Sequence, residues 1–158
     1  MKRAAAIAIG ALVLAVAIPA AAAEATRDTY REEAEPVCKV NTEANERIFA
    51  GVRAEVKQGK LKAASRRFEK AAKALRGTVG QLKPLPRPSA DVERLAHWFT
   101  EVEKEVSLFK ATAAKLRAGN KLAAEKMVVR LTSQAERANA VVVPFQFHYC
   151  RLEPSRFT

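Results

Sequence analysis

The sequence has few of the residues that build most catalytic and metal sites. Its 158 residues include only two cysteines, two histidines and one tryptophan. It contains no His-Glu-x-x-His zinc motif, no serine in a nucleophile elbow and no glycine-rich phosphate loop. Its two cysteines, Cys38 and Cys150, are too far apart in the chain to match zinc-site spacing. We therefore expect no enzymatic activity, no metal site and no cofactor.

The remaining polar residues offer little catalytic chemistry. His97 and His148 have no fixed partner in the pattern, so we expect them to be surface or packed residues. The acids Glu101, Glu103 and Glu105 alternate along a predicted helix, so they should spread around it and not converge as a catalytic pair.

The first 23 residues are typical of a secretory signal peptide. Lys2 and Arg3 precede an apolar run over residues 4–18, and small residues lead up to Glu24. We predict cleavage after Ala23, with Ala22 as the alternative position, and an extracellular or cell-envelope location. If the alanines at 20–23 are counted, the run approaches the roughly 20 residues of a membrane span, so an uncleaved N-terminal anchor is the alternative. No cysteine follows the run, so the sequence offers no lipoprotein-type anchor.

The predicted export indicates the chemical state of the two cysteines. In an oxidising compartment, two cysteines in a small domain form a structural bridge more often than a redox site. We predict a disulfide between Cys38 and Cys150, with two buried free thiols as the alternative. It would join the first helix to the tail of a single domain that comprises residues 24–158.

Apolar residues at spacings of three and four predict four helices. The first runs from Asp28 or Thr29 to Gln58, the second covers residues 61–82, the third begins after Ser89 as its N-cap, and the fourth runs from about Asn120 to Pro144. Pro36 allows two interpretations: the first helix begins at Glu35, or it bends before Cys38. The bend is favoured because Tyr30 and Ala34 continue the apolar stripe in phase.

The breaks between these helices indicate how they are arranged. Gly59 and Gly119 lie in similar segments, 56–64 and 116–124, that predict two tight helical hairpins. Three prolines within residues 84–88 predict a stiff connector between the hairpins. After Pro144, aromatic and polar residues alternate, which favours an extended tail. We therefore predict an all-α, antiparallel four-helix bundle with an extended C-terminal tail.

Basic residues are concentrated on the second predicted helix. The chain has 28 basic and 17 acidic residues, a net charge of +11, or +9 without Lys2 and Arg3. Residues 60–83 hold eight of the bases and one acid. Lys62, Arg66, Lys70 and Lys73 follow helical spacing and should form one exposed stripe. Its partner would be an anionic cell-envelope polymer, a membrane surface or an acidic protein; nucleic acid is a poor fit for an exported chain. The alternative is a solvated face, partly balanced by the acidic first helix.

The aromatic residues suggest a second possible site. Trp98 adjoins the apolar stripe of the third helix, and Phe147 and Tyr149 lie in the tail. The simpler interpretation is that Trp98 packs over the connector or the tail. The alternative is a small-ligand pocket where Trp98, Phe147 and Tyr149 meet.

Several of these features occur together in a recognisable order. They are Tyr30-x3-Ala34-x3-Cys38, the proline connector, the helix with Trp98, the turn at 116–120 and the aromatic tail ending at Cys150. The chain resembles small exported helical proteins of actinobacteria and related high-GC Gram-positive bacteria that have no assigned function. The resemblance implies a cysteine in the first helix and another in the tail, but no activity. The chain departs from the pattern at Pro36 and at residues 145–147, where the tail is usually smaller.

The sequence thus favours a non-enzymatic extracytoplasmic binding or structural module of the cell envelope. A small-ligand-binding protein is the alternative, and an enzyme or inhibitor is the least favoured class.

Overall fold

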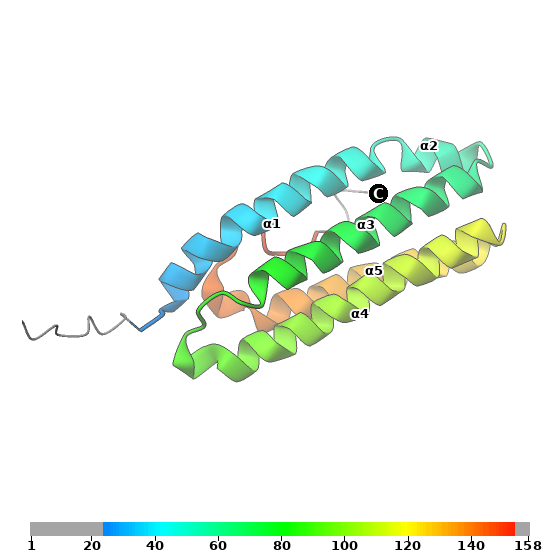
Figure 1. The fold of residues 1–158 in the computed structure, drawn as a ribbon. Helices are drawn as coiled ribbons and strands as arrows, with labels where there is room; N and C mark the ends of the chain where they lie inside the picture. Colours follow the sequence, from blue (N-terminus) through cyan, green and yellow to red (C-terminus); the bar gives the residue numbers. More distant parts are fainter. Residues whose placement is uncertain (1–23, 154–158) are drawn as a thin grey trace, which may run out of the picture.

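The computed structural model describes residues 24–153, so the predicted signal peptide, residues 1–23, lies outside it. Within this part of the chain the structure is helical and contains no strand. Four long helices form a bundle in which successive helices run in opposite directions (Figure 1). They are α1 (Arg27–Phe49), α3 (Leu61–Leu82), α4 (Val92–Arg117) and α5 (Lys121–Val141). Three short elements complete the fold: α2 (Val52–Lys57) and the 3-10 turns η1 (Ser89–Asp91) and η2 (Val143–Phe145). The predicted all-α, four-helix bundle is confirmed.

The first helix starts earlier than Glu35 and ends sooner than predicted. Thr26 caps α1 through a capping box with Thr29, and Pro36 lies inside the helix. The predicted continuation to Gln58 is wrong. The chain breaks at Ala50 and Gly51, and Gly51 has a left-handed φ of 80°, a conformation that glycine adopts without steric cost. Phe49 and Val52, on either side of this break, are both buried in the core.

The two glycine turns have matching hydrogen bonds. The amide of Lys60 donates to the Glu55 carbonyl at 2.8 Å, and the amide of Asn120 donates to the Lys115 carbonyl at 2.9 Å. Both bonds span five residues around a left-handed glycine, as in the Schellman motif. The junctions differ in their caps, because the side chain of Asn120 accepts from Ala123 whereas Lys60 makes no side-chain cap.

The start of α4 and the tail also differ from the sequence interpretation. Ser89 begins the turn η1 and contacts Glu24, so it is not the N-cap of α4; α4 follows Asp91. The tail, residues 143–153, is not extended throughout, because Val143–Phe145 form a 3-10 turn and Gln146 is left-handed with φ 53°. Burial nevertheless alternates over residues 145–148, since Phe145 and Phe147 are buried whereas Gln146 and His148 are exposed.

The core is closed by the tail as well as by helices. Extensive helix–helix packing joins α1 to α3, α3 to α4 and α4 to α5, but does not join α1 to α5. The tail leaves the end of α5 and turns back along α1, shown in orange and red in Figure 1. The carboxylate of Glu35 on α1 accepts hydrogen bonds from the backbone amides of His148 and Tyr149, at 2.6 and 2.8 Å. On the other side, the side chain of Asn139 on α5 forms two hydrogen bonds with the backbone of Leu152, each of 2.8 Å. The tail therefore occupies the seam between α1 and α5.

The predicted disulfide is present at this seam. Cys38 and Cys150 are bonded, with Cα atoms 5.0 Å apart, and both residues are buried. The bond fixes the end of the tail to the middle of α1.

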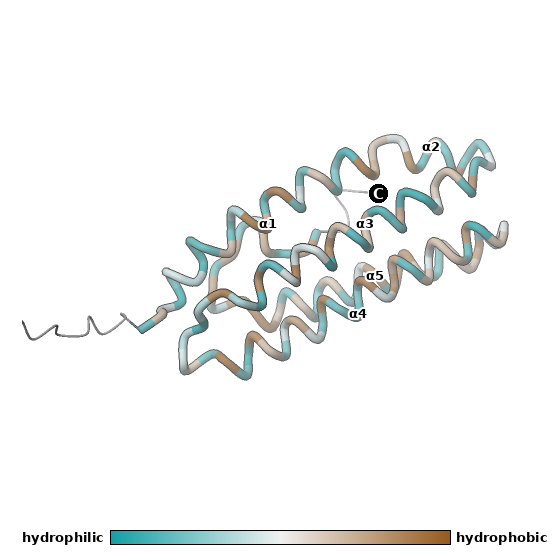
Figure 2. Tube along the Cα trace, viewed as in Figure 1, coloured by the Kyte–Doolittle hydropathy of each residue, from teal (hydrophilic) through white to brown (hydrophobic). Residues whose placement is uncertain are grey.

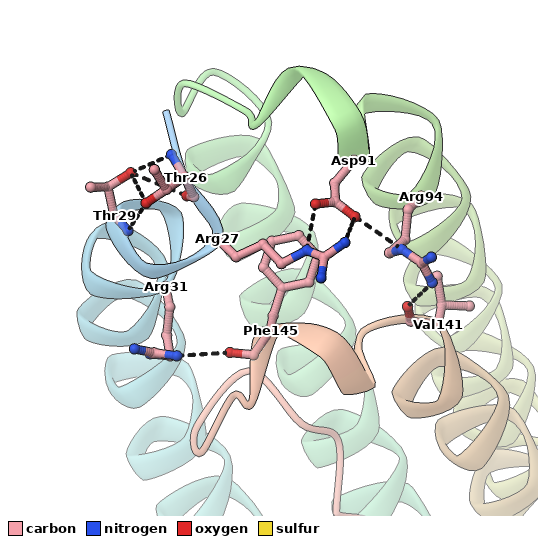
Figure 3. A network of polar contacts seen from close by, with 8 residues as sticks. All are labelled: Thr26, Arg27, Thr29, Arg31, Asp91, Arg94, Val141 and Phe145. Carbon is pink, nitrogen blue, oxygen red and sulfur yellow. Dashed lines mark hydrogen bonds and ion pairs between the residues drawn. The ribbon is translucent and has the colours of Figure 1, made fainter. Parts of the chain in front are cut away.

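A charged network holds the other end of the seam (Figure 3). The carboxylate of Asp91, only 2% exposed, accepts hydrogen bonds from Arg27 at 2.6 and 3.0 Å and from Arg94 at 3.1 Å. Arg94 also donates to the Val141 carbonyl at the end of α5, and Arg31 donates to the Phe145 carbonyl. Asp91 thus connects the first turn of α1 to α4, close to where the tail begins. The Arg27 guanidinium, reinforced by Arg94, holds the pKa of Asp91 below its usual range.

Removing the disulfide should destabilise the protein without dispersing the helices. In the chain-entropy model a cross-link over about 100 residues contributes roughly 4–5 kcal/mol. We expect Cys38→Ser with Cys150→Ser to lower the free energy of unfolding by about that amount while the far-ultraviolet circular dichroism stays helical. Denaturant titration of the oxidised protein, the reduced protein and the double variant measures this. An unchanged midpoint in the double variant would contradict a stabilising role.

Replacing the central carboxylate of the network should also lower stability. We expect Asp91→Asn to lower the free energy of unfolding by about 2 kcal/mol, because hydrogen bonds to a buried charge are lost. Asp91 has a lowered pKa, so its contribution is present above the ordinary aspartate pKa and is lost as the pH falls toward the folded-state pKa. The wild type and variant should therefore converge in acid. Glu125→Gln is the matched control, because Glu125 pairs with Lys121 on the exposed surface and neither residue belongs to the network. An equal loss in both variants would argue against the network.

Candidate functional site: the basic face of α3

The predicted basic stripe forms one exposed surface. Lys62, Arg66, Lys70 and Lys73, which we call the basic face, are all exposed along α3. At 1.5 Å per residue they extend over about 16 Å of helix. Within residues 24–153 none of the four forms an ion pair with an acidic side chain. Figure 2 shows hydrophilic and hydrophobic positions alternating along α3, and the buried positions include Phe68, Leu75 and Val79.

Two other bases of this segment have structural roles. Arg67, one residue from Arg66, makes a two-point contact with Glu55 at 2.8 Å for each bond and donates to the Ile48 carbonyl at 2.6 Å. Lys83 pairs with Glu103 on α4 at 2.6 Å. These residues tie α3 to its neighbours, so their charges are already compensated.

A groove of about 490 Å³ runs between α1, α2 and α3 beside the basic face. Its lining includes Arg66 and Lys70 from the face, together with Arg47 from α1 and the Arg67–Glu55 pair. Hydrogen bonding from Arg67 holds the pKa of Glu55 below its usual range, so this carboxylate stays ionised and occupied by Arg67. The uncompensated charge of the groove is therefore positive.

Arg47 is a residue that the sequence interpretation missed. It lies on the helix that was expected to balance the basic stripe with acids. Its position beside Arg66 follows from the packing of α1 on α3, and nothing in the local sequence indicates this neighbour.

The aromatic residues proposed as ligand contacts belong mainly to the core. Trp98 and Phe147 are buried, and their ring centroids are 5.6 Å apart. The cavity beside Trp98 measures about 20 Å³, which suits a water molecule and not an organic ligand. Tyr149 is half-buried, and Lys39 lies over its ring at 5.6 Å. This packing gives no support to a ligand pocket at Trp98.

The acids of α4 differ from the sequence interpretation. Glu103 faces solvent, but Glu101 and Glu105 are one turn apart on the same side and are both buried. Glu101 accepts from Lys104 at 2.5 Å and from Gln134 of α5 at 2.7 Å, and these bonds lower its pKa to about 2. Glu105 has no such partner, and burial raises its pKa to about 8. The only sequence signal for the different environments of Glu101 and Glu105 is that both acids lie next to the apolar stripe of this helix.

The residues that the structure describes contain no group of three or more His, Cys, Asp or Glu side chains arranged to hold a metal ion. Between residues 24 and 153, each helix is too short or too polar to serve as a membrane span.

Comparison with known proteins does not place this chain in a family. No family model, no curated protein and no solved structure matches it.

The packing of the tail predicts the effect of removing Phe147. Phe147 contacts Trp98, Phe145 and Tyr30, with ring centroids 5.3–6.3 Å apart. We expect Phe147→Ala to lower the free energy of unfolding by about 3–5 kcal/mol and to make Trp98 fluorescence more sensitive to acrylamide. Tyr149→Ala is the control, with a smaller effect because Tyr149 is half-buried. Full stability of Phe147→Ala would contradict this core role.

Proposed function

We propose that this protein is a non-enzymatic, extracytoplasmic module that binds a polyanion of the cell envelope through the basic face of α3. The observation that carries the proposal is the groove beside that face. Arg47, Arg66 and Lys70 meet there without acidic partners, while Glu55 is occupied by Arg67. The signal-like N-terminus and the disulfide support a location outside the cytoplasm.

The dimensions of the face favour a partner with repeated anionic groups. A line of charge about 16 Å long exceeds the size of a single phosphate or carboxylate group. Arginine guanidinium groups bind two oxygens of a phosphate or carboxylate at once, so Arg47 and Arg66 would anchor such a partner in the groove. Lys62 and Lys73 would add attraction at longer range.

The same face lacks the apolar residues that insert into a bilayer. Membrane-surface helices combine basic residues with large apolar side chains on the other side. The exposed large apolar residues of the described chain belong to other elements: Val40, Val92, Leu122, Val129 and Val143. This distribution favours electrostatic contact with an anionic polymer over insertion into lipid.

The test is a change of charge on the face alone. We expect a variant with Lys62, Arg66, Lys70 and Lys73 replaced by Gln to bind an anionic wall polymer at least about tenfold more weakly, because each basic residue near an anionic surface contributes about 1 kcal/mol. Binding by the wild type should fall steeply with salt. Cosedimentation with isolated wall polymer, and separately with anionic lipid vesicles, measures both effects and distinguishes the two surfaces.

A matched control removes the same charge elsewhere. Lys110, Lys115, Lys126 and Arg130 are exposed on α4 and α5 and make no ion pair with the described residues. Their replacement by Gln should leave binding closer to that of the wild type. If the two quadruple variants lose binding equally, the binding depends only on net charge, and the basic face has no specific role. Tighter binding to vesicles than to polymer would replace the polymer with a membrane surface.

A further inference from the structure

A small polar cavity lies inside the bundle, beneath the tail. It has a volume of about 30 Å³ and is lined by α1, α3, α4 and the tail. One water molecule needs roughly 10–15 Å³ by this measure, so the cavity has room for about two waters or for one small ion. Leu75 and Phe109 form apolar walls, and Tyr149 and Leu152 of the tail cover it.

Three side-chain oxygens of the cavity residues have no hydrogen-bond partner within the described residues. They are Oδ1 of Asn41, Oδ1 of Asn45 and Oε2 of Glu105. Asn45 and Glu105 are 4% and 2% exposed, so their side chains are shielded from bulk solvent. Asn41 and Asn45 are one turn apart and therefore share a face of α1. Each buried oxygen without a partner is unfavourable. The two amide oxygens are acceptors, and the carboxyl oxygen is an acceptor in its ionised form.

No donor from the surrounding protein meets this need. Thr42, the hydroxyl residue of the lining, donates to the Tyr149 carbonyl at 3.4 Å. Leu75 and Phe109 have no polar side-chain atoms. The site thus combines one carboxyl group with two amide oxygens, and its chemistry suits an occupant that is positively charged or rich in donors.

We propose that this cavity binds one small monovalent cation, either an alkali-metal ion or an ammonium ion, through Asn41, Asn45 and Glu105. Oxygen ligands are those that hard cations prefer. A single carboxylate neutralises one positive charge, whereas protein sites for calcium use six to eight oxygens and usually several carboxylates. An ammonium ion would instead donate hydrogen bonds to the three acceptors. This site is separate from the basic face, so its test does not depend on whether the proposed function is correct.

The cation would compete with a proton. Burial raises the pKa of Glu105 to about 8, so near neutrality the unoccupied carboxyl group is mostly protonated, and cation binding must release that proton. The lining residues of α1 and α3 carry no charge. Besides Glu105, the titratable and charged residues of the cavity lining come from the tail: His148, Tyr149, Arg151 and Glu153. Arg151 and Glu153 have opposite charges.

Thermal unfolding at equal ionic strength tests the proposal. We expect sodium, potassium, rubidium or ammonium chloride to raise the unfolding midpoint above its value in choline chloride, because choline is too large for the cavity. The increase should grow with cation concentration, as for any ligand that binds only the folded state. The series also separates the two sources, since an effect of ammonium alone assigns an ammonium site and an effect of the metal ions alone assigns an alkali-metal site.

Two variants and one structural measurement complete the test. Glu105→Gln should abolish the difference between cations, whereas Glu103→Gln, which removes an exposed carboxylate from the same helix, should retain it. In the wild type the apparent affinity should rise about tenfold per pH unit below the pKa of Glu105 and level off above it. In crystals grown in rubidium chloride, anomalous scattering should place one ion between Asn41, Asn45 and Glu105. An equal midpoint in choline chloride, an unaltered cation effect in Glu105→Gln, or only water at this position would overturn the proposal.

Discussion

The insertion of the tail between α1 and α5 is the constraint on which the rest of the structure depends. In a four-helix bundle each helix normally covers two neighbours, but here α1 and α5 are not an extensively packed pair. Phe145 and Phe147 supply the apolar surface that this seam requires, and the tail backbone is held on one side by Glu35 and on the other by Asn139. Beyond the 3-10 turn η2 this short segment has no regular secondary structure to stabilise it, and the disulfide keeps it in place.

Much of the fold could be predicted because burial follows the helical period. The bounds of α3 and the caps around Gly59 and Gly119 come from local residues, and the structure has them close to where the sequence indicated. Gly51 shows the limit of this reasoning. The apolar residues on both sides of it remain in phase, so periodicity suggested one uninterrupted helix, whereas a left-handed glycine separates α1 from α2.

Contacts between helices could not be predicted in the same way. The helical period places Leu122 on the apolar stripe of the fourth predicted helix, but Leu122 is 64% exposed. Gln134 is buried and bonds to Glu101. The basic face was predictable because its exposure depends on one helix. Three other features depend on neighbours that are distant in sequence. Arg47 of α1 joins the groove beside the basic face, Glu55 neutralises Arg67 of α3, and Oε2 of Glu105 is buried without a hydrogen-bond partner.

The separation of 112 residues between Cys38 and Cys150 has a consequence for the order of folding. The two hairpins close through contacts between helices that follow each other in the chain, and such contacts form quickly. The tail must return to α1 across nearly the whole domain, so its docking is the step with the largest entropic barrier. Before that step the seam between α1 and α5 lacks its aromatic filling. Oxidation of the cysteine pair would then act as a latch on the last part of the core to assemble, and an oxidising environment would trap the chain in its completed form.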